Sequence, residues 1–154
     1  MKIYLASRYS RRLELCGYRE QLQSVGLTVT SRWLNGKHQI SDSGVPLGDA
    51  GEALIEGDDG SSTDCAAQLR QKFADEDFRD VLACDLLIAF TEPPRSGHSR
   101  GGRHVELGLA LGTMKRVWII GHRENIFCWH EDVRFFETWD QAKDQLLKEQ
   151  AVAV

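Results

Sequence analysis

Short runs of wholly apolar residues alternate along this chain with longer segments of helical periodicity. Residues 86–90 and 117–120 contain only apolar side chains, which is typical of strands that are covered on both faces. Residues 2–6 and 27–33 are the other two predicted strands. Since strands that alternate with helices form a parallel sheet with helices on both faces, this order predicts an α/β fold of three layers.

Helical signals fill the segments between these runs. Ser10 is a candidate N-cap for a helix whose expected stop signal is Gly26. Thr138 and Gln141 have the spacing of a capping box for a last helix that ends near residue 148. Two more helices are predicted over residues 63–83 and 102–111.

The length of 154 residues fits one domain, predicted to span residues 1–154. Residues 35–62 hold six of the fourteen glycines and little apolar periodicity, so they are predicted to form a long, insertion-like surface loop. Two interpretations stay open for this loop: a part in function, or a surface insertion without one.

Composition limits the partners. A net charge of −4 provides no general field that would attract a nucleic-acid polymer or an anionic membrane. The apolar start of the chain is too short for a signal-peptide core, and no apolar run approaches the roughly 18 residues of a membrane span. The four cysteines include no C-x-x-C pair, so we expect free thiols in a cytoplasmic protein.

Glu106 is the first candidate for chemistry. It follows a loop, residues 92–103, that leaves the end of a buried strand, where ligands bind in parallel sheets. Gly101 and Gly102 permit a close approach of the backbone to a ligand, and the helix N-terminus is expected to keep Glu106 ionised. An ionised carboxylate can attack the anomeric carbon of a sugar. The alternative is an exposed glutamate that serves only the helix dipole.

Asp77 is the second candidate. It lies four residues after Phe73 and four before Val81, on the apolar stripe of its predicted helix. A carboxylate on a buried stripe costs free energy unless it is paired or used. An ion-paired structural aspartate is the alternative. The neighbouring acidic residues are assigned to the solvated face of the helix: Asp75, Glu76 and Asp80.

Polar and cationic side chains gather at the loops around this edge of the sheet. Arginine and serine at a helix N-terminus suit a phosphate, and an indole at a strand end suits stacking on a base. Each also has an ordinary interpretation as surface charge or core aromatic. The candidate substrate-binding residues are Ser7, Arg8, Arg32, Trp33, Ser99, Arg100, Gly101 and Gly102.

Several other chemistries lack their motifs. The chain contains no phosphate-binding P-loop, no dinucleotide fingerprint after the first strand and no G-x-S-x-G elbow. His122, Cys128 and His130 match no familiar zinc spacing. The spacing of these residues therefore predicts no metal site.

Four elements in order carry a family resemblance. They are Ile3-Tyr4-Leu5-Ala6, Asp77 placed eight residues before Asp85, the run Asp85-Leu86-Leu87-Ile88-Ala89, and Gly101-Gly102-Arg103-His104-Val105-Glu106-Leu107-Gly108. The chain resembles the nucleoside 2-deoxyribosyltransferase superfamily, which includes the 2′-deoxynucleoside 5′-monophosphate N-hydrolases. The resemblance implies a flavodoxin-like or Rossmann-like three-layer sandwich with a mainly parallel sheet of about five strands.

The resemblance also implies site roles, and it implies neither a metal nor an organic cofactor. Glu106 would attack C1′ of a nucleoside or nucleotide, Asp77 would protonate or orient the departing base, and Tyr4 would position the nucleophile. Arg100 stands where transferases of this family carry an aspartate and nucleotide hydrolases a serine, and an arginine favours a 5′-monophosphate. A homodimer or larger homo-oligomer is implied, with the segment Phe127-Cys128-Trp129-His130 as the candidate that closes a neighbour's pocket.

The sequence thus predicts an enzyme that cleaves the N-glycosidic bond of a 2′-deoxyribonucleoside or its 5′-monophosphate through a covalent deoxyribosyl-Glu106 intermediate. The sugar would pass to another base or to water. A non-catalytic nucleotide-sensing module on the same fold is the main alternative, and an unrelated phosphate-ester enzyme is the third.

Overall fold

A computed structural model describes residues 1–38, 64–94 and 101–152. It contains a parallel sheet of five strands in the order β2-β1-β3-β4-β5. This sheet confirms the flavodoxin/Rossmann-like α/β prediction. The strands are β1 (Lys2–Ala6), β2 (Thr28–Val29), β3 (Leu86–Phe90), β4 (Arg116–Ile120) and β5 (Val133–Phe136).

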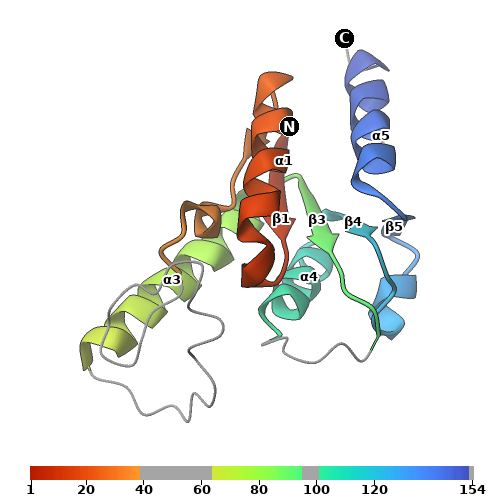
Figure 1. Ribbon diagram of the computed structural model, residues 1–154. Helices are drawn as coiled ribbons and strands as arrows, with labels where there is room; N and C mark the ends of the chain where they lie inside the picture. Colours follow the sequence, from red (N-terminus) through yellow and green to blue (C-terminus); the bar gives the residue numbers. More distant parts are fainter. Residues whose placement is uncertain (39–63, 95–100, 153–154) are drawn as a thin grey trace.

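Helices cover both faces of the sheet (Figure 1): α1 and α5 lie on one face, and α3 and α4 lie on the other. None of the helices within the described ranges is both long and apolar enough to cross a membrane. The helices are α1 (Arg12–Ser24), α3 (Asp64–Ala83), α4 (Gly102–Gly112) and α5 (Trp139–Val152), with 3-10 turns η1 (Tyr9–Arg11), η2 (Arg32–Asn35) and η4 (Ile126–Trp129).

The core lies along the central strands. Every residue of β3 is buried, as its apolar composition predicted, and only the first residue is exposed in β1 and in β4. On the α1/α5 face the ring of Tyr18 stacks between Phe90 and Trp139, with centroid distances of 5.2 and 4.6 Å. This stack packs α1 and α5 against β3 on that face of the sheet.

The predicted second strand, residues 27–33, is wrong in its second half. Only Thr28–Val29 pair as a strand, and the chain then turns into η2. The reason is Ser31, whose Oγ accepts the backbone N–H of Leu5 at 2.6 Å, so a side chain takes the place of a ladder carbonyl.

Helix termini differ from the predictions at Ser10 and at the end of α5, which continues to Val152 rather than ending near residue 148. Ser10 makes no capping hydrogen bond, because it lies inside η1. Half of the predicted capping box is present, since Thr138 Oγ1 accepts from Gln141 N at 3.4 Å. The side chain of Gln141 accepts instead from the backbone N of Glu137, one residue before Thr138, at 3.0 Å. Most of the predicted loop, residues 39–62, lies outside the described residues, and the single-domain assignment stays a prediction.

Candidate active site

The side chains of Tyr4 and Glu106 meet on the face of the sheet that α3 and α4 cover. Tyr4 is fully buried on β1, and Glu106 lies one turn inside α4, which begins after Gly101 at a φ of 80°. The hydroxyl of Tyr4 donates a hydrogen bond of 2.6 Å to Glu106 Oε1. The sequence predicted both residues, and the structure brings them together across 102 positions of the chain.

The pKa of Glu106 is raised to about 8, mainly because the carboxyl group is removed from water. The hydrogen bond from Tyr4 and the charge of Arg103 lower this pKa, while the charge of Asp77 raises it further. The expectation that the helix N-terminus keeps Glu106 ionised is therefore wrong for the free protein. Glu106 lies a full turn beyond the open N–H groups, so burial outweighs the helix dipole.

Asp77 on α3 belongs to the same electrostatic site. Its charge raises the pKa of Glu106 and also that of Tyr4, whose pKa burial raises well above the ordinary value. The Asp77 side chain keeps 28% of its surface exposed, yet its Oδ1 is buried without a hydrogen-bond partner among the described residues. The position of Asp77 on the apolar stripe of α3, between Phe73 and Val81, thus places its carboxylate near Tyr4 and Glu106.

Asp80 was assigned to the solvated face of the helix, and that assignment is wrong. Asp80 is buried and accepts hydrogen bonds from the backbone N and the Nε of Arg32, each at 2.9 Å. Burial raises its pKa, and these contacts oppose the rise. Its position seven residues after Phe73, two helical turns along the same face, is the signal that the sequence contained.

Arg32 and Trp33, both predicted to bind substrate, have structural partners here. Arg32 is held by Asp80, and its Nη1 lies 3.9 Å from Glu76 Oε1. Trp33 is buried, and its Nε1 donates to the carbonyl of Leu5 at 2.9 Å. Together they tie η2 to α3 and β1.

The remaining predicted substrate residues lie at the ends of β1 and of the loop before α4. Ser7 follows β1, and its buried Oγ has no hydrogen-bond partner among the described residues. Arg8 is the N-cap residue of η1. Gly101 and Gly102 open α4, whereas Ser99 and Arg100 lie outside the described residues.

Glu124 was missed by the sequence analysis. Its carboxylate forms a buried ion pair with Arg103 and accepts the backbone N–H of Glu92 at 2.7 Å. One side chain thereby holds both ends of the loop at residues 92–103. Glu124 lies in a loop without periodicity, so no pattern in the sequence marked it.

His38 was also missed. It follows η2 and has no periodic neighbours in the sequence, but the fold places its Nε2 3.4 Å from Asp77 Oδ1.

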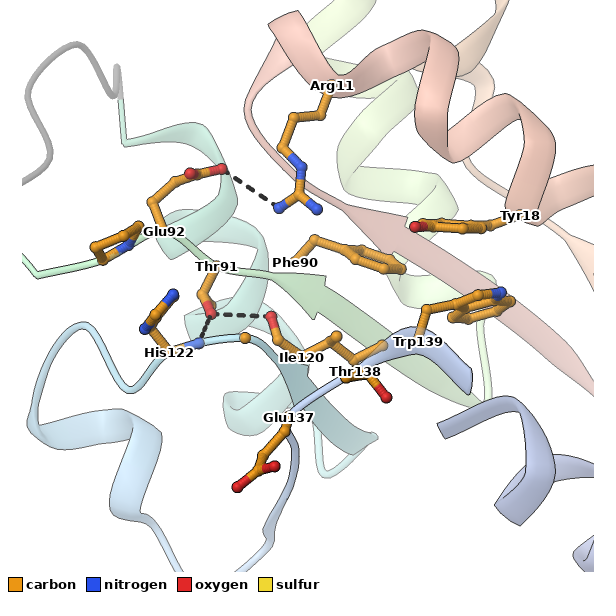
Figure 2. Close-up of a pocket in the computed structure, with 12 residues that line it drawn as sticks. Arg11, Tyr18, Phe90, Thr91, Glu92, Ile120, His122, Glu137, Thr138 and Trp139 are labelled. Atoms are coloured by element: carbon orange, nitrogen blue, oxygen red, sulfur yellow. Dashed lines mark hydrogen bonds and ion pairs between the residues drawn. The ribbon is translucent and has the colours of Figure 1, made fainter. Parts of the chain in front are cut away.

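A separate pocket of about 320 Å³ lies at the ends of β3 and β4 on the α1/α5 side (Figure 2). Its polar groups largely satisfy one another. Arg11 pairs with Glu92 at 3.3 Å, and Thr91 Oγ1 bonds to the carbonyl of Ile120 and the backbone N–H of His122. Neither Tyr4 nor Glu106 lines it.

Within residues 1–38, 64–94 and 101–152, no three His, Cys, Asp or Glu side chains gather as a metal site. Cys16, Cys84 and Cys128 are free thiols, as predicted.

The fold and this geometry define an α/β protein in which a buried tyrosine is hydrogen-bonded to a partly buried glutamate, with a second carboxylate nearby. No family model matches the sequence, and no curated protein matches it either. The structure is similar to that of the CMP N-glycosidase BcmB from Clostridium botulinum, with a TM-score of 0.50 and 16% identity over 95% of this chain and 98% of that one. At this identity the likeness shows a shared fold.

Proposed function

We propose that this protein is a nucleoside 2-deoxyribosyltransferase-like enzyme that cleaves the N-glycosidic bond of a 2′-deoxyribonucleoside or its 5′-monophosphate, with Glu106 as the nucleophile. The observation that carries the proposal is the 2.6 Å hydrogen bond from Tyr4 to Glu106 Oε1, next to the charge of Asp77. A protein of the same fold is a CMP N-glycosidase, which supports this class of chemistry.

The first step, cleavage of the C1′–N bond, needs one carboxylate as nucleophile and one carboxylic acid as proton donor. Glu106 and Asp77, which hold one proton in total, can take these two roles. The proton on Glu106, whose pKa is about 8, moves to Asp77 when substrate binds. Tyr4 holds Oε1, which leaves Oε2 of Glu106 to attack C1′. The C1′–N bond breaks, its electron pair goes to the base nitrogen, and Asp77 gives that nitrogen a proton.

The second step releases the sugar. Water attacks C1′ of the glycosyl ester, the bond from C1′ to Oε2 breaks, and Asp77 takes the proton of the water. A second nucleobase in place of water yields transfer rather than hydrolysis. The sum for hydrolysis is nucleotide plus water giving sugar phosphate plus free base, with both carboxyl groups restored and no cofactor consumed.

Ser7 and Arg8 are the proposed phosphate contacts on the β1 side. The buried hydroxyl of Ser7, which has no hydrogen-bond partner in the part of the chain that the structure describes, supports this role. On the other side, the proposed contacts come from the loop before α4, with Ser99, Arg100, Gly101 and Gly102. A single nucleotide, rather than a nucleic-acid polymer or a membrane, is the proposed partner of a chain with net charge −4. Free thiols support a cytoplasmic enzyme.

We also propose a homodimer or larger homo-oligomer. The side chains of Ile126, Phe127 and Trp129 on η4 are 80%, 61% and 71% exposed, and Val105 on α4 is 72% exposed. A hydrogen-bond contact of 3.4 Å between His104 and Asn125 brings these two elements together. Apolar side chains gathered in this way mark a surface that a second copy would cover.

The test is base release. The protein is incubated with deoxynucleosides and deoxynucleoside 5′-monophosphates, and free base is measured by chromatography. Glu106→Gln should abolish release, whereas Glu20→Gln, an exposed glutamate on α1, is the matched control and should leave it unchanged. Release that survives Glu106→Gln would overturn the proposal. Addition of an acceptor base to the same assay separates transfer from hydrolysis.

The raised pKa of Glu106 favours a second candidate, a nucleotide-sensing module. A carboxyl group that holds its proton at neutral pH can donate a hydrogen bond to a ligand without attacking it. Nucleotide binding in calorimetry with no free base from any substrate would select this candidate.

A further inference from the structure

His38 is a buried imidazole pressed against α3. Its side chain is 8% exposed, and its ring lies 4.4 Å from the ring of Phe73. The Nε2 atom is 3.4 Å from Asp77 Oδ1 and 3.6 Å from Glu76 Oε2. Neither ring nitrogen has a well-aligned hydrogen-bond partner within the described parts of the chain, and the same holds for Asp77 Oδ1.

A buried imidazole and a buried carboxylate oxygen cost free energy when they leave water without a well-formed hydrogen bond. Such groups in native structures call for an explanation, and proton chemistry is a common one. The contact between His38 and Asp77 is short enough for a small rotation of either side chain to complete a hydrogen bond.

Glu76 is a weaker partner for His38 than Asp77 is. Its other carboxylate oxygen, Oε1, lies 3.9 Å from Arg32 Nη1 and 4.0 Å from Lys72 Nζ, so its charge is shared with two cations. Among the basic side chains of the described residues, only that of His38 lies within 4.0 Å of the Asp77 carboxylate.

Asp77 therefore interacts both with His38 and with the Tyr4–Glu106 pair. Its charge raises the pKa of Tyr4 and of Glu106, and its Oδ1 lies 3.4 Å from Nε2 of His38. This order resembles the arrangement in which one group orients another that transfers a proton.

We propose that His38 is a positioning residue for Asp77, holding Oδ1 through its Nε2–H so that Oδ2 faces the departing base. This inference rests on the proposed function. When the C1′–N bond breaks, its electron pair goes to the base nitrogen and the Asp77 proton follows. The carboxylate that remains accepts the Nε2–H bond of His38, which keeps its own proton throughout.

The test compares a base that needs a proton on departure with one that does not. Deoxyguanosine 5′-monophosphate is measured beside its 7-methyl derivative, whose base is already cationic and leaves as a neutral molecule. If the protein prefers pyrimidines, deoxyuridine 5′-monophosphate is measured beside its 5-fluoro derivative, a better leaving group. The variants are His38→Ala, His38→Gln, which keeps an N–H donor, and Asp77→Asn.

We expect His38→Ala to lower kcat for the ordinary base by about 10-fold or more, and for the activated base by less than about 3-fold. His38→Gln should retain part of the kcat that His38→Ala loses. In an Asp77→Asn background, His38→Ala should lower kcat little further, because His38 and Asp77 act on the same step. If His38→Ala fails to fold, as seen by circular dichroism, the difference between the two substrates in His38→Gln decides.

Equal losses on both substrates, or no loss on either, would overturn the role of His38. With Glu106→Gln inactive in the same assay, that result would leave the proposed function standing. An inactive wild-type protein would overturn both.

Discussion

The hydroxyl of Tyr4 on β1 and the carboxylate of Glu106 on α4 are joined by a hydrogen bond of 2.6 Å between two different layers of the fold. The bond fixes one carboxylate oxygen and stabilises the ionised form of a partly buried acid. Its removal should therefore change both the rate and its dependence on pH.

Tyr4→Phe should lower kcat/KM at neutral pH by about 10-fold or more, because the nucleophile loses its orienting partner. The hydrogen bond from Tyr4 lowers the pKa of Glu106, so its loss raises that pKa. The falling limb of the pH–rate profile, where the two carboxyl groups lose the proton that the departing base needs, should therefore move to higher pH. Tyr18→Phe, which also removes a tyrosine–glutamate hydrogen bond, is the control. An unshifted profile would count against the pairing.

Glu106 should also make stability depend on pH. Its pKa is raised from 4.5 to about 8 in the folded protein, so between these values the folded state binds more protons than the unfolded state. The Glu106 contribution to the free energy of unfolding is full below pH 4.5, falls as the pH rises and is lost by pH 8.

Urea unfolding of wild type and Glu106→Gln at pH 5 and pH 9 measures this contribution. The variant should gain about 4 kcal/mol relative to wild type between the two pH values, since each pKa unit corresponds to about 1.4 kcal/mol. A difference between the two proteins that does not change with pH would show that Glu106 titrates normally.

Substitution of Asp80 should lower stability, whereas substitution of Asp77 should lower activity. Asp80→Ala removes the partner of a partly buried guanidinium and should lower the free energy of unfolding by about 2 kcal/mol. Asp77→Asn should abolish most base release with little change in thermal unfolding. The reverse pattern would exchange the roles of the two aspartates.

Ile126→Asp places a charge in the exposed apolar surface of η4 and tests self-association. If a second copy covers this surface, wild type should sediment as a dimer or larger at micromolar concentration and the variant as a monomer. Met114→Asp, at an apolar residue that is even more exposed and lies beyond the C-terminal end of α4, should leave association intact. A monomeric wild type would contradict the proposal.

The sequence predicted the surroundings of a residue correctly where apolar side chains recur at the spacing of a strand or a helix. The wholly apolar composition of β3 predicted a buried strand, and the stripe on α3 led to Asp77. Asp80 lies seven residues after Phe73 and next to Val81, so the same periodicity also indicated its buried face, although it was assigned to the solvated face with its acidic neighbours.

Contacts between distant segments were beyond prediction from patterns. Ser31 ends the pairing of β2 early because its hydroxyl meets Leu5, and nothing near Ser31 in the sequence marks that contact. His38 and Glu124 lie in loops, and only the fold brings them to Asp77 and Arg103. The raised pKa of Glu106 likewise follows from burial, which a helix position alone does not reveal.

Covalent capture tests the nucleophile most directly. A 2′-fluoro-substituted nucleotide slows departure of the glycosyl ester, so intact-protein mass spectrometry should show the protein plus one fluorinated sugar phosphate. Peptide mapping should locate it on Glu106, and Glu106→Gln should acquire none. A label on another residue, or base release with no label at any time, would contradict Glu106 as the nucleophile.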